Sequence, residues 1–175
     1  MKYRNRFDFS GQCSEMGNDA EQLFAKIAES KLWTVTKATR KEQLEHIDVF
    51  LENEKTQKHA IDVKARKKIS RKDADCTDDL LWVEFKNVAG NDGWLKGKAH
   101  YIAFERENDF VIVRRKALLS LCSSIIDFKK IVDKSSDALY CLYRRKNRQD
   151  EISIIKFSDI LNNLSFVIWE KGSDK

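Results

Sequence analysis

The stretch HIDVFLENEKTQKHAIDVKA, residues 46–65, contains two runs in which apolar and polar residues alternate. Alternation with a period of two is typical of β-strands, because successive side chains of a strand point to opposite faces. The polar segment 52–58 separates the two runs, so the stretch predicts a β-hairpin with strands at about 46–51 and 59–65. Two apolar faces result, one formed by Ile47, Val49 and Leu51 and one by Ile61, Val63 and Ala65.

The remaining sequence predicts further helices and strands around this hairpin. Leu23, Phe24 and Ile27 form the apolar stripe of a helix at about 18–31, and Asn18 can cap it. We also expect strands near 32–36, 80–88, 99–106, 109–114, 138–144, 151–157 and 165–169, and helices near 94–98, 116–131 and 158–163. Together these elements predict an α/β fold in which a central mixed, mostly antiparallel sheet is flanked by helices.

The composition is typical of one globular domain. A chain of 175 residues can bury a core of its own, and no apolar run reaches the length of a membrane span. We expect a single domain over residues 1–175, with a core at about 17–120 and a C-terminal extension over 120–175 of unknown role. The N-terminus lacks an apolar signal segment and the four cysteines show no CxxC spacing, so we expect a cytoplasmic protein with reduced thiols.

Acidic side chains gather on the polar face of the predicted sheet. Strand alternation places Asp48, Asp62 and Lys64 on one face. If the next strand along the chain lies beside the hairpin, it adds Glu84 and Lys86 to that face. Neighbouring carboxylates repel one another and resist joint ionisation, and a divalent cation removes that cost. The pattern therefore predicts a site for Mg²⁺, or Mn²⁺, with Asp48 and Asp62 as ligands.

Two of these residues, Asp62 and Lys64, suit a metal ligand and its catalytic neighbour. A bound metal ion lowers the pKa of a water molecule, and an adjacent lysine can orient that water and neutralise charge in the transition state. An ordinary surface ion pair on a half-buried strand explains the same two residues without any function. Glu21, three residues after Asn18, fits a capping-box position or a further metal ligand, and the two roles are compatible. We expect Glu21 or Glu84 to assist the site.

Cationic residues follow the second strand of the hairpin directly. Six Lys or Arg occur within residues 64–72, and further clusters lie at 114–116 and 144–148, in a chain of net charge +5. Such clusters suit phosphate neutralisation, although each one alone is also compatible with a solvated surface. The residues we expect to contact nucleic acid are Arg66, Lys67, Lys68, Arg71, Lys72, Lys86 and Trp94.

This set of residues resembles the PD-(D/E)XK nuclease superfamily, in which a helix acid, a strand aspartate and a D/E-x-K pair on the next strand form the site. The matching positions here are Glu21, Asp48, and Asp62 with Lys64. The segment 82–104, which contains WVEFKNV, GWL and KAHYIAF, is also similar to small phage and bacterial nucleases of this superfamily. The resemblance implies a restriction-endonuclease-like core, built from a helix, a three-strand meander, a helix and a further strand.

The chain departs from the superfamily pattern at two positions. Ile47 stands where a proline usually precedes the first aspartate, and His100 stands where an aspartate is usual in the last element. A second register also fits the pattern, with Asp62 as the first aspartate and Glu84-x-Lys86 as the pair. Asp62 belongs to the site in both registers, and the first is favoured because its hairpin is tighter.

The resemblance implies a Mg²⁺-dependent deoxyribonuclease that hydrolyses phosphodiester bonds of double-stranded or branched DNA. Structure-selective cutting, as in Holliday-junction resolvases, is the favoured subtype because no separate sequence-reading domain is visible, and a homodimer would suit the cutting of two strands. Two alternatives stay open: a non-catalytic nucleic-acid-binding module of the same fold, and an RNA-directed nuclease. No GxxxxGK or GxGxxG motif occurs, so a glycine loop that cradles phosphate has no support.

Overall fold

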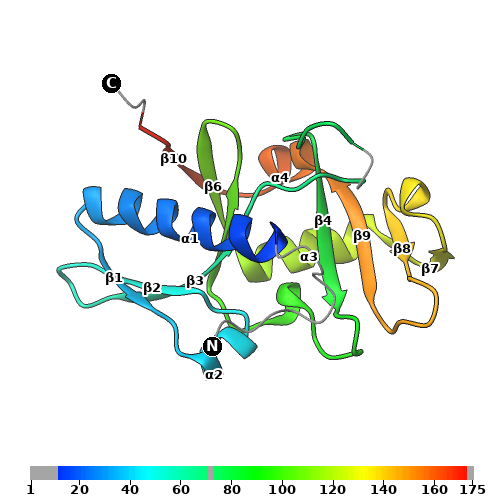
Figure 1. Ribbon diagram of the computed structural model, residues 1–175, viewed down its shortest axis with the longest axis horizontal. Helices are drawn as coiled ribbons and strands as arrows, with labels where there is room; N and C mark the ends of the chain where they lie inside the picture. Colours follow the sequence, from blue (N-terminus) through cyan, green and yellow to red (C-terminus); the bar gives the residue numbers. More distant parts are fainter. Residues whose placement is uncertain (1–11, 71–72, 173–175) are drawn as a thin grey trace.

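Two β-sheets carry the fold of the computed structural model, which describes residues 12–70 and 73–172 (Figure 1). The first sheet has the strand order β1 (Thr34–Lys37), β2 (Val49–Glu52), β3 (Lys58–Lys64), β5 (Tyr101–Glu105), β6 (Asp109–Arg114) and β10 (Phe166–Glu170). The second has the order β4 (Leu80–Lys86), β9 (Glu151–Lys156), β8 (Cys141–Tyr143) and β7 (Asp127–Val132). The helices are α1 (Gln12–Ser30), α2 (Arg40–Leu44), α3 (Arg115–Ile125) and α4 (Phe157–Asn163), with 3₁₀ turns η1 (Trp94–Lys96) and η2 (Ser135–Asp137).

This architecture confirms the expected α/β class with mixed sheets flanked by helices. The predicted hairpin is present as β2 and β3, which pair antiparallel with Val49 opposite Ile61. β3 runs parallel to β5, and β7 runs parallel to β8, whereas the other strand pairs are antiparallel. No helix within the described ranges is both long and apolar enough to cross a bilayer.

The expectation of one central sheet that includes β4 is wrong. β3 is followed across the first sheet by β5, and β4 instead pairs with β9, where Leu80 lies opposite Lys156. The burial of the two strands gives the reason. The three central residues of β5 are buried, which suits a strand covered on both faces, whereas β4 buries only Val83 and Phe85 and leaves its other face partly exposed.

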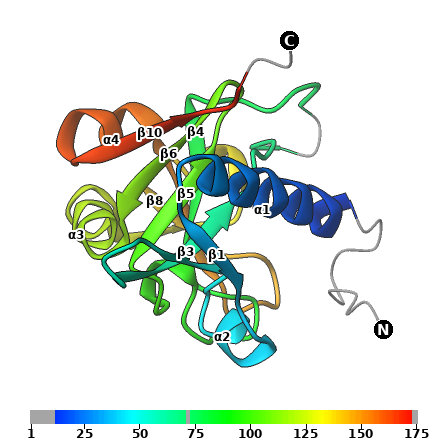
Figure 2. The same ribbon diagram turned by 90° about the vertical axis from the view of Figure 1, so that its left-hand side faces the viewer.

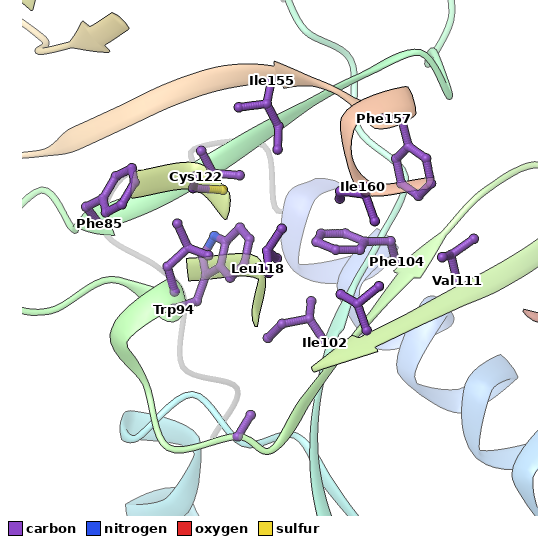
Figure 3. Close-up of a cluster of buried hydrophobic side chains, with 14 of the residues drawn as sticks. Phe85, Trp94, Ile102, Phe104, Val111, Leu118, Cys122, Ile155, Phe157 and Ile160 are labelled. Atoms are coloured by element: carbon purple, nitrogen blue, oxygen red, sulfur yellow. The ribbon is translucent and has the colours of Figure 1, made fainter. Parts of the chain in front are cut away.

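The first sheet is covered on both faces, by α1 on one side and by α3 and α4 on the other (Figure 2). On the α1 side, Phe24 packs with Ile61 and Val63 of β3. On the opposite side, side chains from the first sheet meet those of α3, α4, β4 and β9, as Figure 3 shows for Ile102, Phe104, Leu118, Cys122, Ile155 and Ile160. Each large apolar side chain buried in these layers stabilises the fold by about 1.5–3 kcal/mol. The polar residues of β3 therefore lie between layers of apolar side chains that largely exclude water.

One predicted helix is shorter than expected. The pattern predicted a helix through residue 131, but α3 ends at Ile125 and Ile126 turns to an extended conformation. The chain then forms β7, which pairs with β8 at the edge of the second sheet. The run of β-branched residues at 125–126 favours this switch, because such side chains fit strands better than helices.

Candidate active site

Asp62 is the buried centre of the candidate site. It lies on β3 and is only 1% exposed, and its Oδ1 accepts a hydrogen bond from Lys64 Nζ at 2.6 Å. Its Oδ2 is buried and has no hydrogen-bond partner among residues 12–70 and 73–172. Burial raises the pKa of Asp62 to about 8, although the charge of Lys64 acts in the opposite direction. The fold therefore holds a buried carboxyl group with one oxygen bound by Lys64 and the other without a hydrogen-bond partner among the described residues, although the Asp48 side chain is close enough to raise its pKa.

Asp48 lies directly beside Asp62, just before the start of β2. Its amide donates to the carbonyl of Ile61 at 2.9 Å and its carbonyl accepts from Ala38 at 2.9 Å, so the backbone is fixed on both sides. Its Oδ2 accepts a hydrogen bond from the amide of Val63 at 2.8 Å. The Asp48 carboxylate is thus held against β3 at Val63, the residue between Asp62 and Lys64. Its charge contributes to the raised pKa of Asp62.

Lys64 balances these acids at the end of β3. Its side chain is 24% exposed, and its Nζ lies 5.2 Å from the centroid of the Trp94 ring. Burial by itself would lower the pKa of Lys64, but the charges of Asp62 and Asp48 outweigh burial and raise it. The lysine therefore remains a cation at neutral pH, with its ammonium donating to the Asp62 carboxyl group.

Two further acids reach this cluster from different elements. Glu21 lies on α1, with its Oε2 3.6 Å from Lys37 Nζ, and burial followed by the charge of Asp48 raises its pKa. Glu84 lies on β4, and burial raises its pKa although the charge of Lys64 acts against that shift. Glu84 thus joins the cluster from the second sheet rather than from a strand neighbouring the hairpin.

Each of the four predicted catalytic acids therefore interacts electrostatically with Lys64. A cavity of about 200 Å³ opens beside Lys64 and Glu84. Its other walls include Trp82, Trp94, Phe104 and Arg106. The cavity leaves the lysine and the glutamate accessible to a ligand that approaches from solvent.

The cations after β3 differ in how far they are already engaged. Arg66 forms ion pairs through Nε to Asp78 Oδ1 at 2.6 Å and through Nη2 to Glu107 Oε2 at 3.5 Å. Lys68 Nζ donates to the Ala74 carbonyl at 2.6 Å, while Lys67 is exposed, and its charge acts on Glu84. The two remaining expected contacts of this run, Arg71 and Lys72, lie outside the described residues.

Two expected nucleic-acid contacts lie elsewhere than predicted. Trp94 is 8% exposed and belongs to the core, where its ring meets that of Phe104, so it offers little surface on which a base could stack. Lys86 belongs to a different cluster, where its Nζ lies 2.9 Å from Glu151 Oε1. Its placement there depends on the pairing of β4 with β9, which alternation along β4 could not reveal. Arg144, which the sequence places only in a basic cluster at 144–148, binds the same carboxylate at 3.1 Å.

The donor set of the cluster suits a hard divalent cation. No three His, Cys, Asp or Glu side chains of the described part of the chain converge as a ready-made metal cage. Mg²⁺ commonly takes only one or two protein carboxylates and completes its shell with water and substrate phosphate. The unpartnered Oδ2 of Asp62, with the carboxylate of Asp48 beside it, fits that requirement.

Comparisons of the chain with protein-family models, with curated proteins and with solved structures found no match.

Proposed function

We propose that this protein is a Mg²⁺-dependent endonuclease that hydrolyses phosphodiester bonds of DNA, with a core of the PD-(D/E)XK type. The observation that carries the proposal is the buried Asp62, whose Oδ1 is bound by Lys64 at 2.6 Å and whose Oδ2 has no partner among the described residues. A buried carboxylate without full hydrogen bonding is costly in a purely structural role. A cation bound at Oδ2 offsets that cost.

The chain's own residues have distinct roles in this proposal. Asp62 and Asp48 would hold the metal, and Glu21 or Glu84 would bind its water molecules. When bound, Mg²⁺ supplies a Lewis acid and an acidified water. Lys64 orients the attacking water and offsets negative charge that develops on the phosphate oxygens. The water oxygen bonds to phosphorus, the bond to one sugar oxygen breaks, and that oxygen gains a proton as the water loses one.

The order of elements also supports this core. α1 precedes the antiparallel meander of β1, β2 and β3, and β5 adds a further strand parallel to β3. The chain departs from the expected order between β3 and β5, where it forms β4 and the short η1 instead of an α-helix. The segment that departs from the pattern is therefore the one that brings Glu84 to the cluster.

The position of Lys86 favours the Asp62-x-Lys64 register. Lys64 contacts Asp62, whereas Lys86 contacts Glu151 on β9 and lines a separate cavity. We therefore propose Asp62 and Lys64 as the D/E-x-K pair and Glu84 as an accessory acid.

The test is cleavage of plasmid, single-stranded DNA, a four-way DNA junction and RNA by wild type and Asp62→Asn, with Mg²⁺, Mn²⁺ or EDTA. We expect the wild type to cut DNA with metal and Asp62→Asn to be inactive. Asp159→Asn is the matched control, because Asp159 is a half-buried carboxylate on α4 that accepts from Tyr140 Oη at 2.7 Å, and this variant should cut. Equal cutting by wild type and Asp62→Asn, or no cutting of any substrate, would contradict the proposal.

Two more variants test the assignment of the acids. Asp48→Asn should abolish cutting, because the variant loses a ligand in the proposed register. Glu84→Gln should retain partial activity as an accessory acid. The reverse pattern, full activity in Asp48→Asn and none in Glu84→Gln, would show that the other register is correct.

A further inference from the structure

A second charged cavity lies at the end of β4, away from the acid–lysine cluster. It has a volume of about 230 Å³, and its walls include Lys86, Arg144 and Arg148, which we call the β4-end cation cluster. Gly90, Gln149 and Glu151 complete the lining. Lys86 is the last residue of β4, while Arg144 and Arg148 come from the segment between β8 and β9. The cavity is therefore built largely by the C-terminal part of the chain.

One carboxylate organises this cluster. Glu151 Oε1 lies 2.9 Å from Lys86 Nζ and 3.1 Å from Arg144 Nη2, and its side chain is only 18% exposed. Lys86 and Arg144 share this single carboxylate, so the three paired side chains carry a summed charge of +1, since 2 − 1 = 1. Cations held close together repel, and an anion bound between them removes that cost. The cluster is therefore suited to an anionic ligand.

The chemistry of the arginines favours phosphate as that anion. A guanidinium carries five N–H donors in a rigid fork, and Glu151 accepts one of them from Arg144. The geometry of the fork matches the oxygens of a phosphate, and such charge-assisted bonds are stronger than neutral ones. A phosphodiester can therefore bind without displacing Glu151 from its two partners.

A β-bulge lies on β4 between Glu84 of the acid–lysine cluster and Lys86 of this cavity. Val83 and Phe85 are buried, so Glu84 and Lys86 lie on the opposite, partly exposed face of β4. Glu84 is opposite Ile152 but Lys86 is opposite Glu151, so the partner strand advances one residue while β4 advances two. Bulges of this kind re-aim side chains, and here the shift sets Glu151 beside Lys86.

The two clusters lie close together along β4, because Glu84 of the acid–lysine cluster and Lys86 of the β4-end cation cluster are two residues, roughly 6.6 Å, apart. We propose that the β4-end cation cluster binds a DNA backbone phosphate one or two positions from the scissile one, an inference that rests on the proposed nuclease function. The C-terminal segment would then hold substrate as well as support the fold.

The test compares Arg144→Gln/Arg148→Gln with the wild type. The matched control is Lys129→Gln/Lys130→Gln, which removes the same charge from exposed positions on β7 of the same sheet. We expect the cluster variant to raise KM for DNA by about tenfold with kcat little changed. The slope of the logarithm of its DNA-binding constant against the logarithm of salt concentration should be smaller in magnitude by about one. The control variant should keep the wild-type KM and salt slope. Circular dichroism checks that both variants are folded, and Lys86→Gln replaces the double variant if it is not.

A neutral phosphate analogue locates the contact. After product lengths have mapped the cut, single methylphosphonates are placed at the two phosphates on either side of it. One of these substitutions should raise the wild-type KM by about tenfold and leave the KM of the cluster variant within about twofold, because the two changes remove the same interaction.

Each outcome separates this inference from the proposed function. If the wild type cuts DNA in an Asp62-dependent way but the cluster variant keeps the wild-type KM and salt slope, the inference is overturned and the nuclease assignment stands. If the slope changes but no methylphosphonate within two positions has an effect, the proposed position of the phosphate is overturned. If the wild type neither binds nor cuts DNA, both fail.

Discussion

Replacing Asp62 by asparagine should change how the stability of the protein depends on pH. The carboxyl is 1% exposed, and burial raises its pKa from an ordinary value of 3.8 to about 8. A group with a raised pKa in the folded state contributes stability that is complete below its unfolded pKa and is lost as pH rises through its folded pKa. The metal-free wild type should therefore lose stability between about pH 4 and pH 8.

The size of that loss follows from the shift. Each pKa unit corresponds to about 1.4 kcal/mol, so a shift of about four units sets an upper value of about 5–6 kcal/mol. The asparagine amide in the variant cannot ionise, so this component of the pH dependence should be absent there. Groups that do not interact with Asp62 titrate alike in both proteins and cancel when the two are compared.

The assay is urea unfolding followed by circular dichroism at pH 5.5 and pH 8.5, in EDTA and in Mg²⁺. In EDTA the free energy of unfolding should fall more with pH for wild type than for Asp62→Asn. Mg²⁺ should restore stability to the wild type at pH 8.5, by about 2.7 kcal/mol at a hundred times its dissociation constant, and should leave Asp62→Asn unchanged. Asp159→Asn should keep the response to Mg²⁺. Identical pH dependence in wild type and Asp62→Asn would refute the reasoning about the buried carboxylate.

Four other substitutions have expected outcomes. Lys64→Met should lower kcat by about 10²–10⁴-fold in a single-turnover cleavage assay, because the water loses its orienting cation. Gly93→Ala should lower thermal stability and activity, because the added Cβ would lie 2.5 Å from the carbonyl oxygen of Glu84. Gly17→Ala in α1 adds a Cβ that meets no atom within 4 Å, so this variant should stabilise the helix by about 0.5–1 kcal/mol. Arg115→Met should destabilise the fold by about 2–4 kcal/mol in urea titrations without altering the salt dependence of DNA binding, because this buried side chain donates to two backbone carbonyls.

The local parts of the site could be predicted from the sequence. Alternation along residues 58–64 was enough to place Asp62 and Lys64 on one face, and the hairpin turn was enough to bring Asp48 beside them. These relations depend on neighbours that are close in the chain. A strand pattern fixes which side chains share a face whatever the strand's partner is.

The long-range parts could not be predicted in the same way. Alternation in β4 correctly put Glu84 and Lys86 on one face, but it could not say that β9 rather than β3 would lie beside them. The clusters of basic residues were equally ambiguous: Arg115 is buried as a core donor, whereas Arg144 lines a charged cavity. The difference depends on packing partners that lie far away in the chain.

The pairing of β4 with β9 also sets an order in time. Leu80 lies opposite Lys156, a separation of 76 residues (156 − 80). Contacts this distant in sequence form late, because the chain loses the entropy of closing a long loop before the contacts can stabilise it. During synthesis the hairpin acids emerge and can fold while β4 still lacks its neighbour, so Glu84 gains its fixed position only after β9 has left the ribosome. Nascent chains and fragments that stop before β9 would therefore lack a fixed Glu84, and with it the full set of acids on which the proposed nuclease activity depends.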